Sequence, residues 1–456
     1  MSKYEMDMCS GPLLKKLIIF SAPLMLSGML QLLFNAMDII VVGRWTGSEA
    51  LAAVGSTSSL NVVIMNLFIG ITIGANVLTA RYYASRDFKK LSDTVHTAIL
   101  TGIVSGFMLL AAGVLISRPA LELMGSPDDV IDLSALYMRI YFCGMPFFMV
   151  YNFGAAILRA TGDTRRPLYY LIAAGLTNIC LNLIFVIVFN MGVAGVATAT
   201  VISQMLSCFL VLRLLLKTDG PYHLDLKQLR INWRILGDML RIGVPAGLQS
   251  MLINFSNVLI QSSVNSFGSL AMAGCAAATN VNSFLYMGVN AVTQACLSFT
   301  SQNYGVGNLK RIDRVILLCV MMDLVVGTVL GVLSAVFGES IIGIYSTDPK
   351  VIAYGMENIM VVCIPYALCG IMDTLPGAIR GMNYSTIPMF ITLTGVCLFR
   401  IFWIYAIFPA HRSIMNLYIS YPASWVLTIA MQLVCLIIVR SKVRKRYAHH
   451  ADALSS

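Results

Sequence analysis

Four polar side chains stand at a similar depth within apolar stretches of the first half of the chain. Asp38 lies near the end of the first stretch, and Asn178 and Asn182 are four residues apart, hence on one helical face. Thr200 follows on the next stretch. One carboxylate with three neutral side chains that offer oxygen atoms suits a Na⁺ ion or a proton. The alternative is that Asp38 reaches the interface and the amides make ordinary helix–helix hydrogen bonds.

The second half of the chain does not repeat this set. In the second half, Ile260 stands opposite Asp38 at an offset of 222 residues, and Trp403 stands opposite Asn182 at an offset of 221. We therefore expect the cation or proton site in the first half alone. The sequence shows no nucleophile–base pair, phosphate-binding loop or metal-ligand cluster, so neither an enzyme nor a cofactor is expected.

The second half carries Asp323, Asp373 and Arg400 within its own apolar stretches. Ionisable groups are costly inside a membrane, so each of them is a functional candidate. We expect Asp373, its first-half counterpart Asn152, and Arg400 to contribute to a substrate cavity. A salt bridge from Asp373 to Arg380 is the structural alternative. Arg400 is expected to pair with an acidic group or with carbonyls at a helix end.

The stretches that position these residues are typical of a polytopic membrane protein. Hydrophobic residues make up 58% of the chain and charged residues 11%, which is too apolar for a water-soluble surface. About twelve stretches reach the roughly 20 residues that a spanning helix needs. We expect an all-α fold of twelve transmembrane helices with cores at 16–40, 52–80, 95–117, 133–157, 168–189, 193–216, 239–265, 271–299, 315–337, 352–376, 388–408 and 415–439.

An internal repeat relates the two halves at an offset of 221 residues. An even number of spans in each half keeps both halves in one orientation, so the repeat is parallel. We expect a six-helix lobe at 1–217, a cytoplasmic linker at 218–235, a second six-helix lobe at 236–440 and a basic tail at 441–456. The pairs at this offset include Arg159 and Arg380, Pro167 and Pro388, Asn61 and Asn282, Thr79 and Thr300, Tyr83 and Tyr304, and Gly106 and Gly327.

Prolines inside the expected spans predict helix bends, because proline removes a backbone hydrogen bond. Pro23 and Pro245 recur near the repeat offset in the first and seventh spans. Pro376, followed by Gly377, predicts a further bend in the tenth span.

Basic residues indicate the orientation in the membrane. The great majority of the 31 Lys and Arg residues fall in loops on the side that holds both termini, which predicts cytoplasmic termini. This bias explains the net charge of +10 without a nucleic-acid partner. The eleven cysteines are mostly scattered singly through the apolar stretches and are expected to pack as small apolar residues. The loops of the opposite side hold only Arg44, Arg118, Lys350 and Arg412.

Three segments together resemble the multidrug and toxic compound extrusion (MATE) family. The first reads SAPLMLSG followed by AMDIIVVGRWTGSEALAAVG, and the second reads LRATGDTRRPLYY followed by TNICLNLIFVIVFNMGVAGVATATVISQ. The corresponding loop of the second half reads GAIRGMNYSTIPM. The resemblance runs over nearly the whole chain.

The resemblance implies a polyspecific exporter of two six-helix lobes around a central cavity, driven by inward Na⁺ or H⁺. The cation-site positions of the family carry over to Asp38, Asn178, Asn182 and Thr200. Asn182 is a departure, because many members have an aspartate there, and its loss disfavours Na⁺. The acid that some members carry in the seventh span is also missing.

We therefore expect a secondary active multidrug efflux antiporter that exports organic cations or amphipathic compounds in exchange for H⁺ or Na⁺. The alternative is a flippase for a lipid or a lipid-linked saccharide, which should line its cavity with more cationic residues. An ion channel would need a filter or repeated pore rings, which are not visible. The expected partners are small-molecule substrates and membrane lipids, the expected state is a monomer, and the expected location is the plasma membrane.

Overall fold

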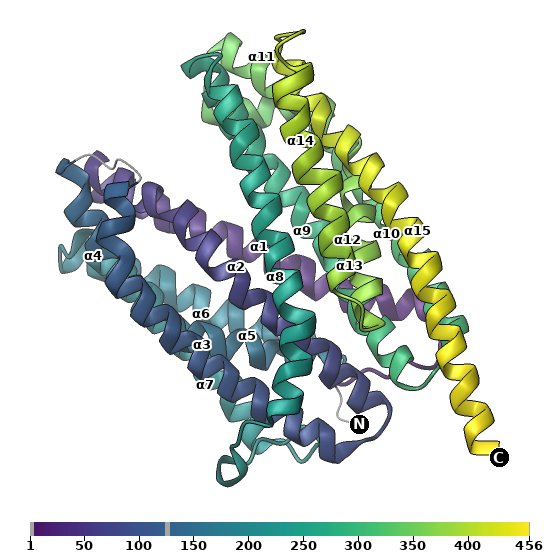
Figure 1. Cartoon of the computed structure of the whole chain (residues 1–456). Helices are drawn as coiled ribbons and strands as arrows, with labels where there is room; N and C mark the ends of the chain where they lie inside the picture. The colour runs from purple at the N-terminus through teal and green to yellow at the C-terminus, as the bar shows by residue number, and fades with distance from the viewer. Residues whose placement is uncertain (1–3, 124–127, 456) are drawn as a thin grey trace. The chain divides into compact units, whose positions relative to one another are not determined.

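The computed structural model describes residues 4–123 and 128–455, and every regular element within those ranges is helical (Figure 1). Helices satisfy their backbone N–H and C=O groups internally, which a chain in a bilayer requires. The elements of the first half are α1 (Leu13–Trp45), α2 (Ser48–Ala84), α3 (Phe88–Leu123), α4 (Asp128–Cys143), α5 (Met145–Ala160), α6 (Arg165–Leu183), the π-helical turn η1 (Ile184–Val188) and α7 (Gly192–Lys217).

The second half has the same order of elements after a short 3₁₀ turn, η2 (Leu226–Gln228). Two of its spans contain three π-helical turns between them, in each of which one extra residue fits into a helical turn. The elements are α8 (Trp233–Asn265), α9 (Ser269–Gly305), α10 (Leu309–Tyr345), α11 (Pro349–Asn358), η3 (Ile359–Cys363), α12 (Tyr366–Gly381), α13 (Thr386–Thr392), η4 (Leu393–Leu398), α14 (Phe399–Phe402), η5 (Trp403–Ile407) and α15 (Ile414–Ser455).

These elements form twelve spans in the described residues. Eight helices are long and apolar enough to cross a membrane, and two bent pairs bring the number to ten. α8 and α9 hold the remaining two places, with 33 and 37 residues. They carry amide side chains such as Gln249 and Asn254, which make them less apolar than the others. The predicted all-α fold of twelve helices is confirmed.

The two bent spans are the fourth and the tenth. α4 and α5 meet at 45°, and the helix of α11 and η3 meets α12 at 46°. The bend of the tenth span lies at Pro365, which precedes α12, whereas α12 continues through Pro376. Proline is tolerated at the start of a helix, where its missing N–H has no intrahelical partner. Pro23 and Pro245 lie inside α1 and α8, which continue through them.

The repeat is visible in the lengths and positions of the helices. α2 and α9 each have 37 residues, and α5 and α12 each have 16. Within both pairs, the first residues are 221 positions apart. The glycines that precede α2 and α9 share an unusual backbone conformation, with φ of 104° at Gly47 and 96° at Gly268. Only glycine adopts such a φ without strain.

The chain forms two compact units whose boundaries fall inside helices. Unit 1 consists of the segment that ends at Asp7 together with Leu26–Gly247. Unit 2 consists of Met8–Met25 and the chain from Leu248 onward. The first turns of α1 therefore belong to unit 2, and the first half of α8 belongs to unit 1.

Glycine allows the same close helix contact in each unit. A Cβ atom on Gly106 of α3 would lie 2.4 Å from Cα of Pro146, and one on Gly327 of α10 would lie 2.5 Å from Cα of Ala367. Both members of the second pair lie 221 residues after those of the first. The backbones of these helices therefore approach each other where the sequence provides no side chain.

The loop that follows α5, between the fourth and fifth spans, has a structural role in unit 1. Gly162 has φ of +96°, and a Cβ there would collide with the backbone of Met6. Asp163 accepts hydrogen bonds from the backbone N–H groups of Arg165 (3.2 Å) and Arg166 (3.1 Å) and pairs with the Arg166 guanidinium. Burial raises the pKa of the Asp163 carboxyl, whereas the bonds to Arg166 oppose that shift. The loop therefore holds the start of α6.

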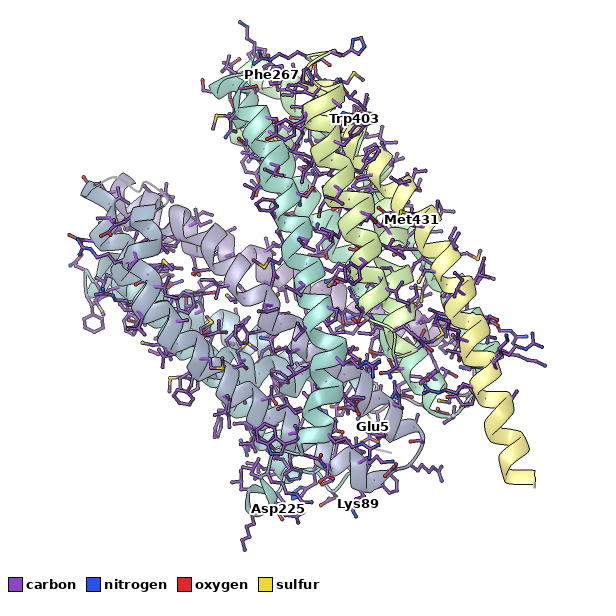
Figure 2. All side chains as sticks on the ribbon, in the orientation of Figure 1. Glu5, Lys89, Asp225, Phe267, Trp403 and Met431 are labelled. Carbon is purple, nitrogen blue, oxygen red and sulfur yellow. The ribbon has the colours of Figure 1, made fainter. Side chains whose placement is uncertain are left out.

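Residues 218–232 connect the halves and pack onto unit 1. Tyr222 is fully buried, and its hydroxyl donates to Glu5 at 2.9 Å. Tyr83 donates to the same carboxylate at 3.0 Å. Figure 2 shows Glu5, Lys89 and Asp225 at the same end of unit 1. The polar connection therefore packs against the helices of unit 1.

We predict that Gly106→Ala and Gly327→Ala each destabilise the protein by about 1–3 kcal/mol, because the added methyl group must push two backbones apart. Thermal unfolding of the purified protein in detergent measures the effect. Gly343→Ala on α10 is the matched control, since nothing lies within 4 Å of its Cβ position. Equal stability of Gly327→Ala and Gly343→Ala would show that the contact is not tight.

Candidate functional site

The structure brings Asp38, Asn178, Asn182 and Thr200 into one hydrogen-bonded chain inside unit 1. Nδ2 of Asn182 donates to Oδ1 of Asp38 at 2.5 Å and to Oδ1 of Asn178 at 3.2 Å. Nδ2 of Asn178 donates to Oγ1 of Thr200 at 3.3 Å, and that hydroxyl donates to the Val196 carbonyl at 3.0 Å. The chain thus joins α1, α6 and α7 through polar side chains, with its single carboxylate at one end.

A contact between α1 and α6 places Asp38 beside the two asparagines. Gly175 lies against the Phe34 ring, so that a Cβ on this glycine would be 1.9 Å from the ring. Asp38 is four residues beyond Phe34, and Asn178 is three residues beyond Gly175. Residues three and four apart lie on one helical face. The Phe34–Gly175 contact therefore brings the polar faces of both helices together.

The turn between α6 and α7 brings the polypeptide back to the depth of Asn178. The π-helical turn η1 begins directly after α6, and Gly192 adopts φ of +57° before α7. A Cβ on Gly195 would lie 3.0 Å from Cβ of Phe185, so the hairpin is closed tightly. This close return places Thr200 within hydrogen-bond reach of Asn178.

Apolar and aromatic side chains surround the carboxylate. Val41 and Val42, about one turn beyond Asp38, pack in a buried cluster with Val186 of η1. Tyr137 and Tyr141 of α4 stack at 5.9 Å between ring centroids, and both interact electrostatically with Asp38. These tyrosines were not predicted from the sequence, although their spacing of four residues is a helical-face signal.

The oxygen atoms of this chain are suited to a small cation. Asn182 is completely buried, and its Oδ1 has no hydrogen-bond donor. Such an orphaned acceptor next to the Asp38 carboxylate fits a Na⁺ ion or the proton of a carboxylic acid. Asp38, Asn178, Asn182 and Thr200 would hold the ion. No group of three or more His, Cys, Asp or Glu side chains suited to a metal occurs among the described residues.

Asp373 of α12 lies half-buried in unit 2, beside the Tyr286 hydroxyl of α9. Arg380 lies near enough to interact with this carboxyl electrostatically, but none of the ion pairs among the described residues joins the two. The Arg380 guanidinium instead donates to Oε1 of Gln249 at 2.6 Å. The alternative of an Asp373–Arg380 salt bridge is therefore wrong, because Gln249 takes the guanidinium.

Arg400 lies buried within unit 2, but its partners differ from the expected ones. Its Nε donates to Ser424 at 3.0 Å and its Nη1 to Oδ1 of Asn257 at 2.8 Å. The guanidinium also lies 4.3 Å from the Tyr421 ring centroid. The expectation of an acidic partner or helix-end carbonyls is wrong. Neutral oxygens and an aromatic face stabilise the charge here, as in a cation–π contact.

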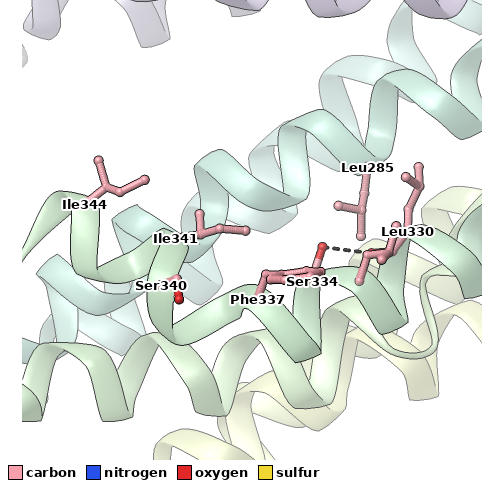
Figure 3. A pocket seen from close by; sticks show the side chains of 8 residues that line it. Leu285, Leu330, Ser334, Phe337, Ser340, Ile341 and Ile344 are labelled. Atoms are coloured by element: carbon pink, nitrogen blue, oxygen red, sulfur yellow. Dashed lines mark hydrogen bonds between the residues drawn. The ribbon is translucent and has the colours of Figure 1, made fainter.

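The remaining candidates do not form a site in the described residues. The Asn152 amide donates to the Phe148 carbonyl of its own helix at 2.8 Å. A pocket on the surface of α9 and α10 lies apart from the predicted residues (Figure 3). Its only polar side chains are serines, and Ser334 donates to the Leu330 carbonyl at 2.9 Å. The pocket is lined by Leu285, Leu330, Leu333, Ser334, Phe337, Ser340, Ile341 and Ile344.

Known proteins resemble this chain over most of its length. Two probable multidrug resistance proteins of Bacillus subtilis, YoeA and YpnP, are 28% and 30% identical to it. The YoeA alignment covers 91% of this chain and 92% of the relative, and the YpnP alignment covers 82% and 84%.

A solved structure has the same fold. It is the outward-facing conformation of a multidrug resistance MATE family transporter, with a TM-score of 0.90 at 20% identity over 97% of this chain and 99% of that chain. The family model described as MatE matches residues 23–184 and, a second time, residues 245–406. The two matched ranges follow the internal repeat. The chain is therefore a multi-pass membrane protein that belongs to the multidrug and toxic compound extrusion family of transporters.

Proposed function

We propose that this protein is a multidrug efflux antiporter that exports amphipathic organic cations in exchange for a proton bound at Asp38. The hydrogen-bonded chain from Asp38 to Thr200 is the main support for this proposal. The names of the two Bacillus subtilis relatives support multidrug export as the cargo class. The biased distribution of basic residues supports cytoplasmic termini, with the protein in the plasma membrane.

Asn182 can respond to the protonation state of Asp38. An amide group donates through its nitrogen and accepts through its oxygen. When Asp38 is ionised, Asn182 donates to it through Nδ2, and its own Oδ1 is left without a partner. When Asp38 binds a proton, rotation of the amide lets Oδ1 accept from the carboxylic O–H. Both states of Asp38 therefore have a favourable partner.

Rotation of this amide would also reverse the direction of the other hydrogen bonds, from Asn182 through Asn178 to Thr200. Oδ1 of Asn182 would then face Asn178, so Asn178 must turn to donate through its own Nδ2. Oδ1 of Asn178 would then accept from the Thr200 hydroxyl, which at present donates to Val196. A proton at Asp38 would thus change hydrogen bonding on α6 and α7 as well as α1. This is a local event that biases the packing of three helices.

Two features favour the proton over Na⁺. A Na⁺ ion held by one carboxylate and neutral oxygens is stabilised less than one held by two carboxylates, and it must lose its water. A proton needs only one carboxylate in a buried environment. The tyrosines and valines around Asp38 provide that environment.

The flippase alternative is less well supported by the second half of the chain. A cargo that carries a pyrophosphate would need free cationic groups. The Arg400 guanidinium is already held by Asn257, Ser424 and Tyr421, and Arg380 is held by Gln249. Organic cations require no such groups.

We predict that Asp38→Asn lowers gradient-driven export by about tenfold or more, because the variant can neither bind nor release a proton at this position. Export of a fluorescent organic cation from proteoliposomes under an imposed pH gradient measures the loss. Asp313→Asn, an exposed acid paired with Arg440, is the control and should keep full transport. Normal export by a well-inserted Asp38→Asn protein would exclude Asp38 as the coupling group.

We predict that a pH gradient alone drives export by the wild type and that Asn182→Asp adds a Na⁺ dependence. The second carboxylate supplies a further charged oxygen for the ion, but it cannot donate to ionised Asp38. Export rates under separate Na⁺ and pH gradients distinguish the two ions. Wild-type transport that requires Na⁺ and ignores the pH gradient would contradict this prediction.

We predict that Asp373→Asn reduces export of cationic compounds by about fivefold or more relative to neutral ones, because a carboxylate makes a charge-assisted contact with a cation. Tyr286→Phe is the companion variant, since it removes the hydroxyl beside Asp373 and keeps the charge. It should preserve the preference for cations. Equal loss of both cargo types in Asp373→Asn, with reduced thermal stability, would assign Asp373 to helix packing.

A further inference from the structure

Asp323 of α10 is completely buried in unit 2, and none of the ion pairs in the described part of the chain includes it. Neither of its carboxyl oxygens has hydrogen-bond geometry to any group, although Thr374 of α12 lies beside it. The carboxyl instead lies against Gly370, where a Cβ would be 3.0 Å from Cγ of Asp323. A carboxylate ion in such a place costs many kcal/mol in free energy, so an unpartnered acid is expected to be neutral there.

The internal repeat shows that the fold does not require this acid. The residue 221 positions before Asp323 is Gly102, and the residue 221 positions before Thr374 is Phe153. In unit 1, a Cβ on Gly102 would lie 3.0 Å from the Phe153 ring. The apolar pair of the first half is thus replaced by an acid and a hydroxyl at the same helix contact.

Gly370, which faces Asp323, also differs from its counterpart in the first half. Gly370 corresponds to Met149 of the first half, where the facing residue is Gly102. In unit 2 the larger residue of this facing pair is Asp323 on α10 and not the residue on α12. The absence of a side chain at Gly370 makes room for the carboxyl. Space for Asp323 therefore comes from a residue that is specific to the second half.

Charged and titratable groups near Asp323 do not neutralise it. On α12, Asp373 interacts with it as a like charge, and Cys369 lies one turn before Asp373. Arg380, farther along α12, donates to Gln249. α10 itself contributes Cys319, one turn away from Asp323.

The other elements packed against α10 supply no cation at this level either. On α9, Tyr286 lies beside Asp373, and Cys296 lies beside Cys319. η3 contacts α10 at Gly331, more than two turns beyond Asp323, through Cys363. α11 packs still farther along, where Gly355 lies against the Ile342 side chain near the end of α10.

We propose that Asp323 is a second proton-binding site, separate from Asp38, and that it holds a proton whenever α10 and α12 are packed as in this structure. The two helices touch through backbone at Gly327 and Ala367, one turn from Asp323. Water can reach the carboxyl only if that contact opens. Release of the proton is therefore linked to separation of α10 from α12.

Two hydroxyls provide a path for the proton toward α9. Thr374 lies beside the carboxyl, and its Oγ1 is 3.1 Å from Oγ1 of Thr293. Each hydroxyl can donate and accept, so once the contact between α10 and α12 opens the pair can relay the proton from the carboxyl toward α9. This site goes beyond the proposed coupling at Asp38, because it lies in unit 2 and uses none of the same residues.

Infrared spectroscopy of the purified protein tests the proposal, since a protonated carboxyl has a C=O band that a carboxylate lacks. We predict that this band is present at neutral pH in the wild type and in Asp38→Asn, and that Asp323→Asn loses a component of it. Asp313→Asn, on the same helix but exposed, should leave the band unchanged. An undiminished band in Asp323→Asn would overturn the proposal, whatever the result for Asp38.

Backbone hydrogen exchange tests the link to helix packing. At alkaline pH, peptides from 320–331 and 366–377 of the wild type should exchange about fivefold faster or more than at neutral pH, relative to peptides of unit 1. The double variant Asp323→Gly with Thr374→Phe restores the first-half pair and should remove this acceleration. If the Asn variant does not fold, the double variant serves in the infrared test as well. Exchange in the wild type that accelerates no more than in the double variant would exclude the link.

Discussion

The cost of leaving a polar side chain without a partner in the membrane interior governs the polar side chains of this protein. Water cannot satisfy them there, so the protein must supply each donor, acceptor or counter-charge. Arg400 meets this requirement with Asn257, Ser424 and an aromatic face, whereas Arg380 meets it only in part, through the bond from its Nη2 to Gln249. Asn182 and Asp323 do not meet it fully. At such side chains a bound proton or ion would satisfy a buried polar atom that lacks a partner.

Close helix packing sets up these positions. Helices in a bilayer gain no hydrophobic driving force from touching each other, so van der Waals contact at small residues matters more. Gly175 lets Phe34 of α1 approach α6 and so brings Asp38 to Asn182. Gly370 gives the Asp323 carboxyl its space. A glycine in each case decides where a charged group can lie.

Duplication gave the two halves one backbone plan, and their chemistry then diverged. The lengths of α2 and α9, and of α5 and α12, remain equal. The polar chain of the first half has no equivalent in the second, and the buried acid at Asp323 has none in the first. Each half therefore offers a different group that can bind a cation or a proton, on helices of the same design.

Much of the fold and of the candidate site could be predicted from the sequence alone. Composition and the length of apolar stretches determine twelve spanning helices, because a bilayer demands about 20 apolar residues per span. The residue matches at one offset determine the repeat. The grouping of Asp38, Asn178, Asn182 and Thr200 followed from depth along each span, since helical rise is regular.

Only the tertiary structure decided which partner each polar group takes. Sequence position gives depth and helical face, but it does not specify which neighbouring helix a face meets. For that reason Arg400 was expected to find an acid and instead meets neutral oxygens, and Arg380 turns to Gln249 and not to Asp373. The isolation of Asp323 is likewise a property of packing, because it depends on a glycine almost fifty residues away in the chain.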